Sequence, residues 1–456
     1  MSKRVKTLVI VLGILVLLIG GYYGSILLKN KKSDLESSYV PPAKLGNLEN
    51  TDLVKIETST FALEKNNDIW ELSYLEGGIP PSGIELDQMQ IQYLTYSLAT
   101  VWTESIVEEE PEDLSVYGLD NPPFMTNVTD STGRKAEYIL GDMTPSRDSY
   151  YIMEKGEPKV YTISGYLANL LQIPLDVIRQ RYLFPEFALP ALSALRLESA
   201  GTRIEIIPIK KSSGSYLDSS FATYVLTSPY KTQRGVNSEA LNELLAPLYR
   251  LAKEDFIDDN PSSLAPYGLD KPFKIFLQTE NASIDLLIGD EVNGKRYAKA
   301  ADAPGVFTLS NMEGIVNVKA FGLIDKFVLL VNIDNVDHLT ISGGEKNLDA
   351  NFLGKGDEAQ YFLNGKSADT KNFRLFYQTV IGLLTDAEYT TTVARQSEDT
   401  REITIEYRLN TPPGQSLSIS LIPHNRDFYL LRQEGATEFL ISRNQVRKIY
   451  QSADKL

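Results

Sequence analysis

The sequence contains no cysteine and only two histidines, His338 and His424. The lack of thiols excludes disulfide bonds, thiolate zinc sites, iron–sulfur clusters, cysteine nucleophiles and the modified cysteine of a lipoprotein. The scarcity of histidine leaves few candidates for the base of a nucleophilic triad. His338 stands at the predicted start of a strand and His424 in a predicted turn, so neither is assigned a catalytic role.

Acidic residues are missing from residues 1–32, which contain six lysines and arginines. The rest of the chain carries 39 of the 45 basic residues against all 60 acidic residues, a net charge of −21. A body this acidic repels nucleic acid and anionic lipid headgroups. Because no basic patch with interleaved aromatic residues offsets the charge, we expect no nucleic-acid partner.

Charged residues are also missing from residues 7–28, a run of 22 residues that follows Lys3, Arg4 and Lys6. As a helix this run is about 33 Å long, enough to cross a bilayer core of about 30 Å. Residues 1–32 are therefore predicted to be a transmembrane anchor. A cleaved signal peptide is the alternative, but no small-residue cleavage site follows the run.

The orientation of this anchor is set by the charges on its two sides. Lys29, Lys31 and Lys32 lie on the far side, so the positive-inside rule is close to a tie. We expect the N-terminus in the cytoplasm and the bulk of the chain outside it, at the cell membrane. Residues 33–50 are rich in serine, proline and charge, which predicts a tether of about 25 Å root-mean-square span.

A nine-residue motif at residues 114–122 recurs 150 residues later in the chain. The register extends upstream without a gap, with Leu94 and Leu98 matching Leu244 and Leu248, and with Pro111 matching Pro261. Agreement of this length indicates an internal duplication. Besides the first leucine, the shared residues of the two copies are Tyr117, Gly118, Leu119, Asp120 and Pro122, and Tyr267, Gly268, Leu269, Asp270 and Pro272.

The duplicated stretch has the composition of a turn. Glycine adopts positive φ without steric cost, aspartate bonds its own backbone, and proline ends regular structure. The stretch is either a structural corner between a helix and a strand or a binding loop repeated in each copy. These residue types favour the corner, and we expect Gly118 and Gly268 at positive φ.

The repeat divides the chain after the tether into three modules, at residues 51–190, 191–336 and 337–456. In the first, Ile91, Leu94, Leu98 and Val101 recur at helical spacing. Hairpins follow at residues 125–141 and 150–163, and a last helix is predicted over residues 166–181. The second module repeats this order. The third lacks the corner and is a degenerate terminal copy, with a helix predicted from Phe373 to Leu383.

The predicted fold class is α+β. It comprises an N-terminal transmembrane helix followed by three tandem, mostly antiparallel β-sheet modules, each with one or two packed helices.

The Tyr-Gly-Leu-Asp-x-Pro corner resembles that of the DUF4340 family, as do the Gly141-Asp142 pair after a strand and the hairpin that ends in Tyr161-Thr-Ile. The likeness covers nearly all of the chain after the tether, and faintly so in the third module. It implies a bacterial envelope protein, often encoded beside gliding-motility-type ABC transporter systems. The family's motifs are structural, so it implies no catalytic residue, and the association with a permease is one of neighbourhood.

Two acidic runs, Glu108-Glu109-Glu110 and Asp258-Asp259, occupy matching places in the repeat. Paired carboxylates serve glycoside hydrolysis or bind calcium. However, adjacent residues of an extended segment point to opposite faces, and the sequence contains no Asp-x-Asp-x-Asp-Gly loop and no Gly-x-x-x-x-Gly-Lys-Ser/Thr loop. A solvated acidic rim is the favoured interpretation.

These observations predict a protein that is not an enzyme and that needs no cofactor or metal. The expected role is a membrane-tethered, extracytoplasmic accessory, binding or scaffold protein that works with an ABC-type transporter complex. The alternative is a hydrolase of envelope polysaccharide or cell wall that uses the repeated acids.

Overall fold

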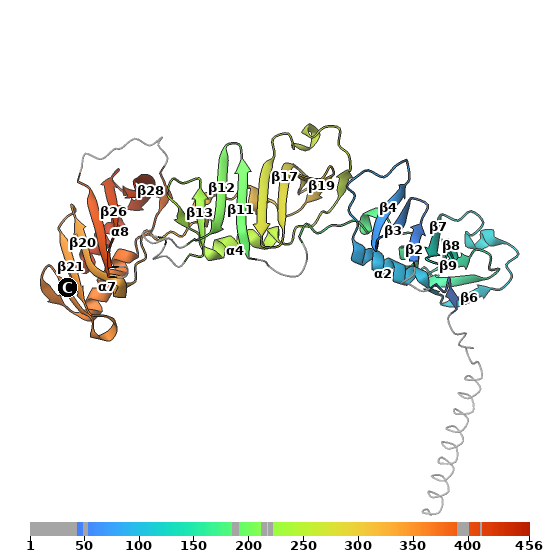
Figure 1. The fold of residues 1–456 in the computed structure, drawn as a ribbon, viewed down its shortest axis with the longest axis horizontal. Helices are drawn as coiled ribbons and strands as arrows, with labels where there is room; N and C mark the ends of the chain where they lie inside the picture. The colour runs from blue at the N-terminus through green and yellow to red at the C-terminus, as the bar shows by residue number, and fades with distance from the viewer. Residues whose placement is uncertain are drawn as a thin grey trace, which may run out of the picture. The chain divides into compact units, whose positions relative to one another are not determined.

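The computed structural model describes residues 43–48, 53–184, 191–210, 217, 222–389, 401–410 and 413–456. These residues form three large antiparallel β-sheets, one two-stranded sheet and a few helices (Figure 1). The described residues divide into two compact units, one within residues 43–80 and 86–179 and the other within residues 81–85 and 180–456. The fold is therefore mostly antiparallel β-sheet with few helices.

The predicted transmembrane segment, residues 1–32, lies outside the described residues. Within the described ranges, no helix is both long and apolar enough to cross a bilayer. The end of the predicted tether proves to be folded: β1 (Lys44–Leu45) pairs with β5 (Val101–Trp102), and Leu45 and Leu48 are buried. The tether prediction was too long, because these two leucines join the first hydrophobic core.

The first sheet has eight strands in the order β4-β3-β2-β7-β8-β9-β10-β6. Alternate residues of a strand face opposite sides of a sheet, and Val128 and Asp130 of β7 are buried on one side. The two predicted hairpins are present: the turn at residues 130–133 joins β7 to β8, and the turn at residues 155–156 lies between β9 and β10. The strands are β2 (Leu53–Glu57), β3 (Phe61–Asn66), β4 (Ile69–Leu75), β6 (Ser105–Glu108), β7 (Phe124–Asp130), β8 (Lys135–Met143), β9 (Ser149–Glu154) and β10 (Val160–Ser164).

Two helices accompany the first sheet. In α2 (Gln88–Ala99) the Asp87 side chain caps the first turn, and Ile91, Leu94 and Leu98 are buried. Burial of each such side chain contributes about 1.5–3 kcal/mol. Val101, expected on this helix, instead lies in β5.

The last helix of the first module is shorter than predicted. α3 (Gly165–Leu171) is followed only by a 3₁₀ turn, η3 (Leu175–Val177), and not by a helix to residue 181. Pro174 explains the difference, because it lacks an N–H and disfavours helical backbone at Ile173.

The second sheet has nine strands in the order β14-β13-β12-β11-β16-β17-β18-β19-β15. Its main helix, α4 (Ser238–Leu248), begins at the cap residue Asn237 and buries Leu241, Leu244, Leu245 and Leu248. Two short helices, α5 (Glu313–Val316) and α6 (Ala320–Leu323), follow the sheet. The strands are β11 (Leu192–Ser199), β12 (Thr202–Pro208), β13 (Tyr224–Ser228), β14 (Arg234–Gly235), β15 (Phe256–Asp258), β16 (Phe273–Thr279), β17 (Ser283–Val292), β18 (Lys295–Ala300) and β19 (Val306–Leu309).

The third sheet also has nine strands, in the order β23-β22-β21-β20-β25-β26-β27-β28-β24. Its helices are α7 (Thr370–Ile381) and α8 (Arg443–Ala453); Leu383, expected on the first, lies just past its end. The strands are β20 (Val336–Ser342), β21 (Leu348–Leu353), β22 (Gln360–Leu363), β23 (Lys366–Ala368), β24 (Ala387–Glu388), β25 (Ile403–Asn410), β26 (Pro413–Pro423), β27 (Phe428–Gln433) and β28 (Ala436–Ser442).

All three sheets follow one path. The first three strands form a meander, which β14 and β23 extend by a fourth short strand in the second and third sheets; the main helix follows, and the chain then returns beside the first strand to complete the sheet. The short strand that comes soon after the helix lies at the far edge in each case, as β6, β15 and β24. The internal repeat seen in the sequence is thus a repeat of topology as well.

The segment that leads into each sheet pairs with the residues just after that sheet's main helix. Matching backbone hydrogen bonds of 3.0, 2.8 and 2.8 Å run from the N–H groups of Thr103, Lys253 and Thr385 to the carbonyl oxygens of Ala43, Arg181 and Lys326. These bonds recur because the topology recurs, although the side chains differ.

The buried side chains form two clusters. One belongs to the first sheet and its helices. The other is continuous over the second and third sheets, from Phe184 to Ala453. The second and third sheets therefore share one hydrophobic core.

Candidate functional site

The first residue of the acidic run in the first module, Glu108, is hydrogen-bonded to a tyrosine of the repeated corner. The Tyr117 hydroxyl donates a hydrogen bond of 2.6 Å to Glu108 Oε2, and its ring lies 5.0 Å from that of Tyr151 in an edge contact. The second module repeats both contacts: the Tyr267 hydroxyl donates to Asp258 Oδ2 at 3.0 Å, and its ring lies 5.1 Å from that of Tyr297 in an edge contact. In each copy the hydrogen bond to the carboxylate raises the pKa of the tyrosine, so the hydroxyl remains a donor at neutral pH.

The glycine of the corner and the Gly-Asp pair of a later strand lie in contact. Gly118 has φ +66, and a Cβ atom built on it would stand 2.6 Å from the carboxyl carbon of Asp142. Gly268 has φ +67, and its Cβ atom would stand 2.4 Å from the carboxyl carbon of Asp290. The positive φ expected from the sequence is therefore present in both copies, and the two motifs form one structural corner.

The rest of the corner behaves alike in both modules. The corner leucines are buried and the aspartates that follow them are exposed. Each corner is a short 3₁₀ turn, η2 (Leu114–Tyr117) or η5 (Ala265–Tyr267), that ends at its glycine. Pro122 and Pro272 are half-buried just before β7 and β16. The expected corner between a helix and a strand is therefore wrong in one respect: the 3₁₀ turn joins two strands, β6 to β7 and β15 to β16, because a short strand follows each main helix.

The other acids of the first run, Glu109 and Glu110, are exposed. Glu109 forms an ion pair of 3.4 Å with Lys159. Asp258 also accepts the backbone N–H of Asn260 at 3.0 Å, which makes it a local turn residue. Within the described residues, no group of three or more histidine or acidic side chains is placed to hold a metal ion.

Both histidines belong to the third sheet or one of its turns. His338 is the third residue of β20, and its Nε2 lies 3.2 Å from Asp349 on the neighbouring strand β21. His424 is only 1 % exposed, at the turn between β26 and β27, in edge contact with Tyr389. The turn was expected from the sequence, whereas its burial was not.

A buried polar contact joins the second and third sheets. Arg234 of β14 is 1 % exposed; its Nη1 donates to Gln433 Oε1 at 2.5 Å, and its guanidinium lies 4.7 Å from the ring centre of Phe439. The Gln433 amide in turn donates to the carbonyl of Val328 at 3.3 Å. We call this region the joint; its polar members are Tyr230, Thr232, Arg234, Lys326, Glu388, Gln433 and Glu438.

Two glutamates of the third sheet hold the loop before Arg234. Glu438 accepts the backbone N–H of Lys231 at 2.6 Å and the Thr232 hydroxyl at 2.8 Å. Glu388 accepts the hydroxyl of half-buried Tyr230 at 2.5 Å, and burial raises the pKa of that tyrosine. These contacts satisfy polar groups that would otherwise be costly to bury.

Lys326 lies in the segment that leads from the second sheet into the third. Its ammonium contacts the carbonyl and the ring of Phe321. Burial lowers the pKa of Lys326 to about 8, an effect that Glu388 opposes and Arg234 reinforces. The joint is therefore sensitive to charge as well as to packing.

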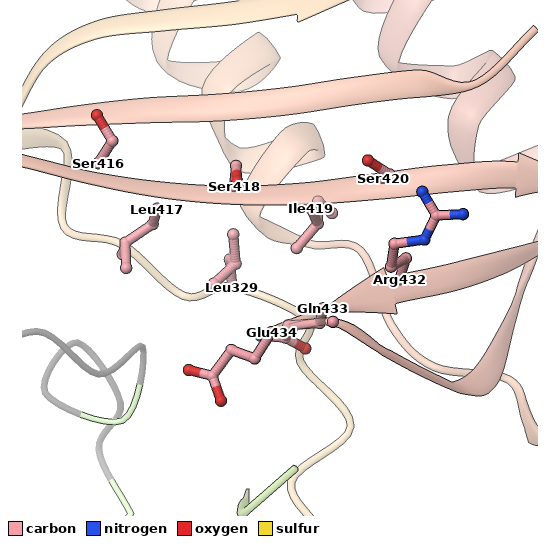
Figure 2. A pocket seen from close by; sticks show the side chains of 10 residues that line it. Leu329, Ser416, Leu417, Ser418, Ile419, Ser420, Arg432, Gln433 and Glu434 are labelled. Carbon is pink, nitrogen blue, oxygen red and sulfur yellow. The ribbon is translucent and has the colours of Figure 1, made fainter. Parts of the chain in front are cut away.

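A groove of about 310 Å³ opens beside the joint, along β26 and the β27–β28 turn (Figure 2). Ser416, Ser418 and Ser420 project to one side of β26, and Leu417 and Ile419 project to the other, toward Leu329 (Figure 2). Arg432, Gln433, Glu434 and Gly435 complete the lining.

The groove offers hydrogen-bonding groups but no catalytic set. A serine nucleophile needs an adjacent base; the lining contains no histidine, and its one carboxylate, that of Glu434, belongs to the β27–β28 turn and points away from the serines of β26 (Figure 2). Arg432 forms an ion pair of 3.0 Å with Glu402. The lining of the groove therefore places no base beside its serines.

One protein-family model matches this chain. A model described as a domain of unknown function (DUF4340) matches residues 79–219 and 225–406, more than half of the chain. The chain belongs to the DUF4340 family. No curated protein and no solved structure matches it.

Each DUF4340 match contains one copy of the corner. The second match ends at residue 406, before β26, β27, β28 and α8, so Gln433 and Glu438 lie beyond it. No motif or repeat in the sequence pointed to a role for Arg234, Gln433 or Glu438. The only sequence signal was a charged residue at position 234, where the first repeat has Ile84.

Proposed function

We propose that this DUF4340 protein is a membrane-tethered accessory or binding subunit, not an enzyme. The observation that carries the proposal is that the first acid of each acidic run accepts the hydrogen bond of a corner tyrosine, in both repeats alike. A carboxylate that accepts this hydrogen bond has a structural role in the corner. This supports a structural origin for the repeated acids, which were the best candidates for hydrolysis.

The joint supports a scaffolding role for the second and third sheets. Their shared core and the buried contact between Arg234 and Gln433 hold the two sheets in one relative orientation. A protein that presents a surface to a partner benefits from such preorganisation, because little conformational entropy is then lost on binding.

The proposed location rests on the sequence of residues 1–32. The uncharged run and the strong acidity of the remainder support a single-pass anchor with a cytoplasmic N-terminus and an extracytoplasmic body. Family resemblance suggests an ABC-type permease as the partner. The alternative is a hydrolase of envelope polysaccharide or cell wall, for which the exposed Glu109 and Glu110 remain candidates.

The proposal is tested by affinity purification of the full chain from detergent-solubilised membranes. We expect an integral-membrane permease to copurify with both the native chain and a variant with alanine at Glu109, Glu110 and Asp259. Copurification of no membrane protein, with turnover of purified cell-wall fragments that the variant lacks, would favour the hydrolase.

A further inference from the structure

A second pocket lies at the far end of the third sheet, between the β20–β21 turn and the helix α8. Its volume is about 240 Å³. Gly343, Gly344 and Glu345 form the turn, Arg401 precedes β25, and α8 provides one face with Arg443, Val446, Arg447 and Tyr450.

Arginines dominate the charge of this pocket. Arg443 and Arg447 are four residues apart and so lie on the same face of α8. The Arg443 guanidinium is held in place: Nε donates to the carbonyl of Asn425 at 2.8 Å, and the group lies 4.5 Å from the ring centre of Tyr429. With Arg401, three arginines line the pocket against one carboxylate, that of Glu345.

A tyrosine hydroxyl adds a neutral donor. Tyr450 is 3 % exposed; its hydroxyl oxygen faces the backbone of Glu345, and its O–H has no acceptor of standard geometry among the described residues. Burial raises the pKa of Tyr450 to about 12, so the hydroxyl stays protonated at neutral pH.

The glycine turn is shaped around this hydroxyl. A Cβ atom on Gly344 would stand 1.8 Å from Tyr450 Oη, and one on Gly343 would stand 1.9 Å from the carbonyl oxygen of Glu402. Only glycines let the turn approach the tyrosine and β25 so closely.

From these contacts we propose that the pocket between the β20–β21 turn and α8 binds a small oxyanion, the phosphate or carboxylate group of a soluble ligand. Guanidinium groups match the geometry of both oxyanions and bind them through charge-assisted hydrogen bonds. The three arginines concentrate positive charge in one place on a chain whose formal net charge is −15. This site is independent of the proposed membrane partner.

The test measures thermal stability and isothermal titration of the full chain with inorganic phosphate and with succinate, against sodium chloride at equal ionic strength. A ligand that binds the folded state raises the melting temperature with concentration. We expect saturable binding of at least one of the two anions, and the one that binds more tightly identifies the class of ligand.

Matched variants on α8 assign the binding to this pocket. Arg447→Gln removes an exposed arginine that lines the pocket, whereas Lys448→Gln removes the same charge from the next exposed position of the helix, outside the lining. We expect Arg447→Gln to weaken binding about ten-fold or more and Lys448→Gln to leave it within about two-fold, since hydrogen bonds to charged groups contribute about 1.5–3 kcal/mol.

Tyr450→Phe provides a second, nearly isosteric test of the hydroxyl and is expected to weaken binding several-fold. Binding of neither anion beyond the effect of chloride would overturn the proposal. An equal loss of affinity in Arg447→Gln and Lys448→Gln would also overturn the proposal, because the loss would then reflect only the lower positive charge of the surface.

Discussion

Arg234 and Gln433, 199 residues apart in the chain, are joined by a buried hydrogen bond of 2.5 Å. Their side chains are 1 % and 4 % exposed. The Gln433 amide also donates a hydrogen bond to the Val328 carbonyl. One amide therefore links a strand of the second sheet, the connecting segment and a strand of the third sheet.

Arg234→Met is expected to destabilise the joint by about 1–3 kcal/mol, because it leaves the buried amide oxygen of Gln433 without this donor. Unfolding in urea should be followed by circular dichroism, since both tryptophans, Trp70 and Trp102, lie in the first compact unit.

Arg432→Met is the matched control for this change. Arg432 adjoins Gln433 but forms an exposed ion pair with Glu402, so its loss should cost less than about 1 kcal/mol. Equal effects of the two substitutions would contradict a special role for the buried contact.

Gly118→Val and Gly268→Val are each expected to cost at least about 1 kcal/mol of stability, because valine is strained at positive φ and its Cβ would collide with Asp142 or Asp290. Gly156→Val separates the two causes, since Gly156 has φ +95 but nothing within 4 Å of the added Cβ. Melting profiles should show a smaller loss for Gly156→Val. An unchanged profile for both corner variants would favour a ligand-binding role.

Stability should depend on pH through Lys326. Its pKa is lowered by burial to about 8, from an ordinary value of 10.5. Between these values the folded state binds fewer protons than the unfolded state, so this lysine's contribution to stability rises with pH over that window. Below pH about 8 both states are charged and its cost is fully present.

Lys326→Met should therefore gain stability relative to the native chain at pH 7, and the gain should shrink by pH 10. Lys319→Met, at an exposed position nearby, should show no such trend in urea unfolding at the two pH values. A gain that does not change with pH would show that Lys326 is solvated.

The repeat made the sheets predictable, because apolar alternation and turn residues are local signals that recur at a fixed offset. The corner was predictable for the same reason, down to the sign of φ at Gly118. The last helix of the first module is shorter than predicted, because Pro174 interrupts it. The joint and the arginine pocket were not predictable, because Arg234, Gln433 and Tyr450 acquire their partners only when distant segments pack together.

A chain that begins at Ser33 is expected to leave the membrane fraction, because it lacks the uncharged run and keeps a net charge of −21. Fractionation of cells that express the two forms checks this. If the shortened chain still sediments with membranes in high salt, the body itself binds lipid or a partner.

Crosslinking in intact cells tests the proposed function most directly. A photoreactive residue at Glu109 or Asp259, in the two matching acidic runs, should give adducts confined to one or two integral-membrane proteins. The contrary result is the absence of any protein adduct, together with turnover of purified cell-wall or polysaccharide fragments that disappears when Glu108 and Glu109, or Asp258 and Asp259, are replaced by alanine.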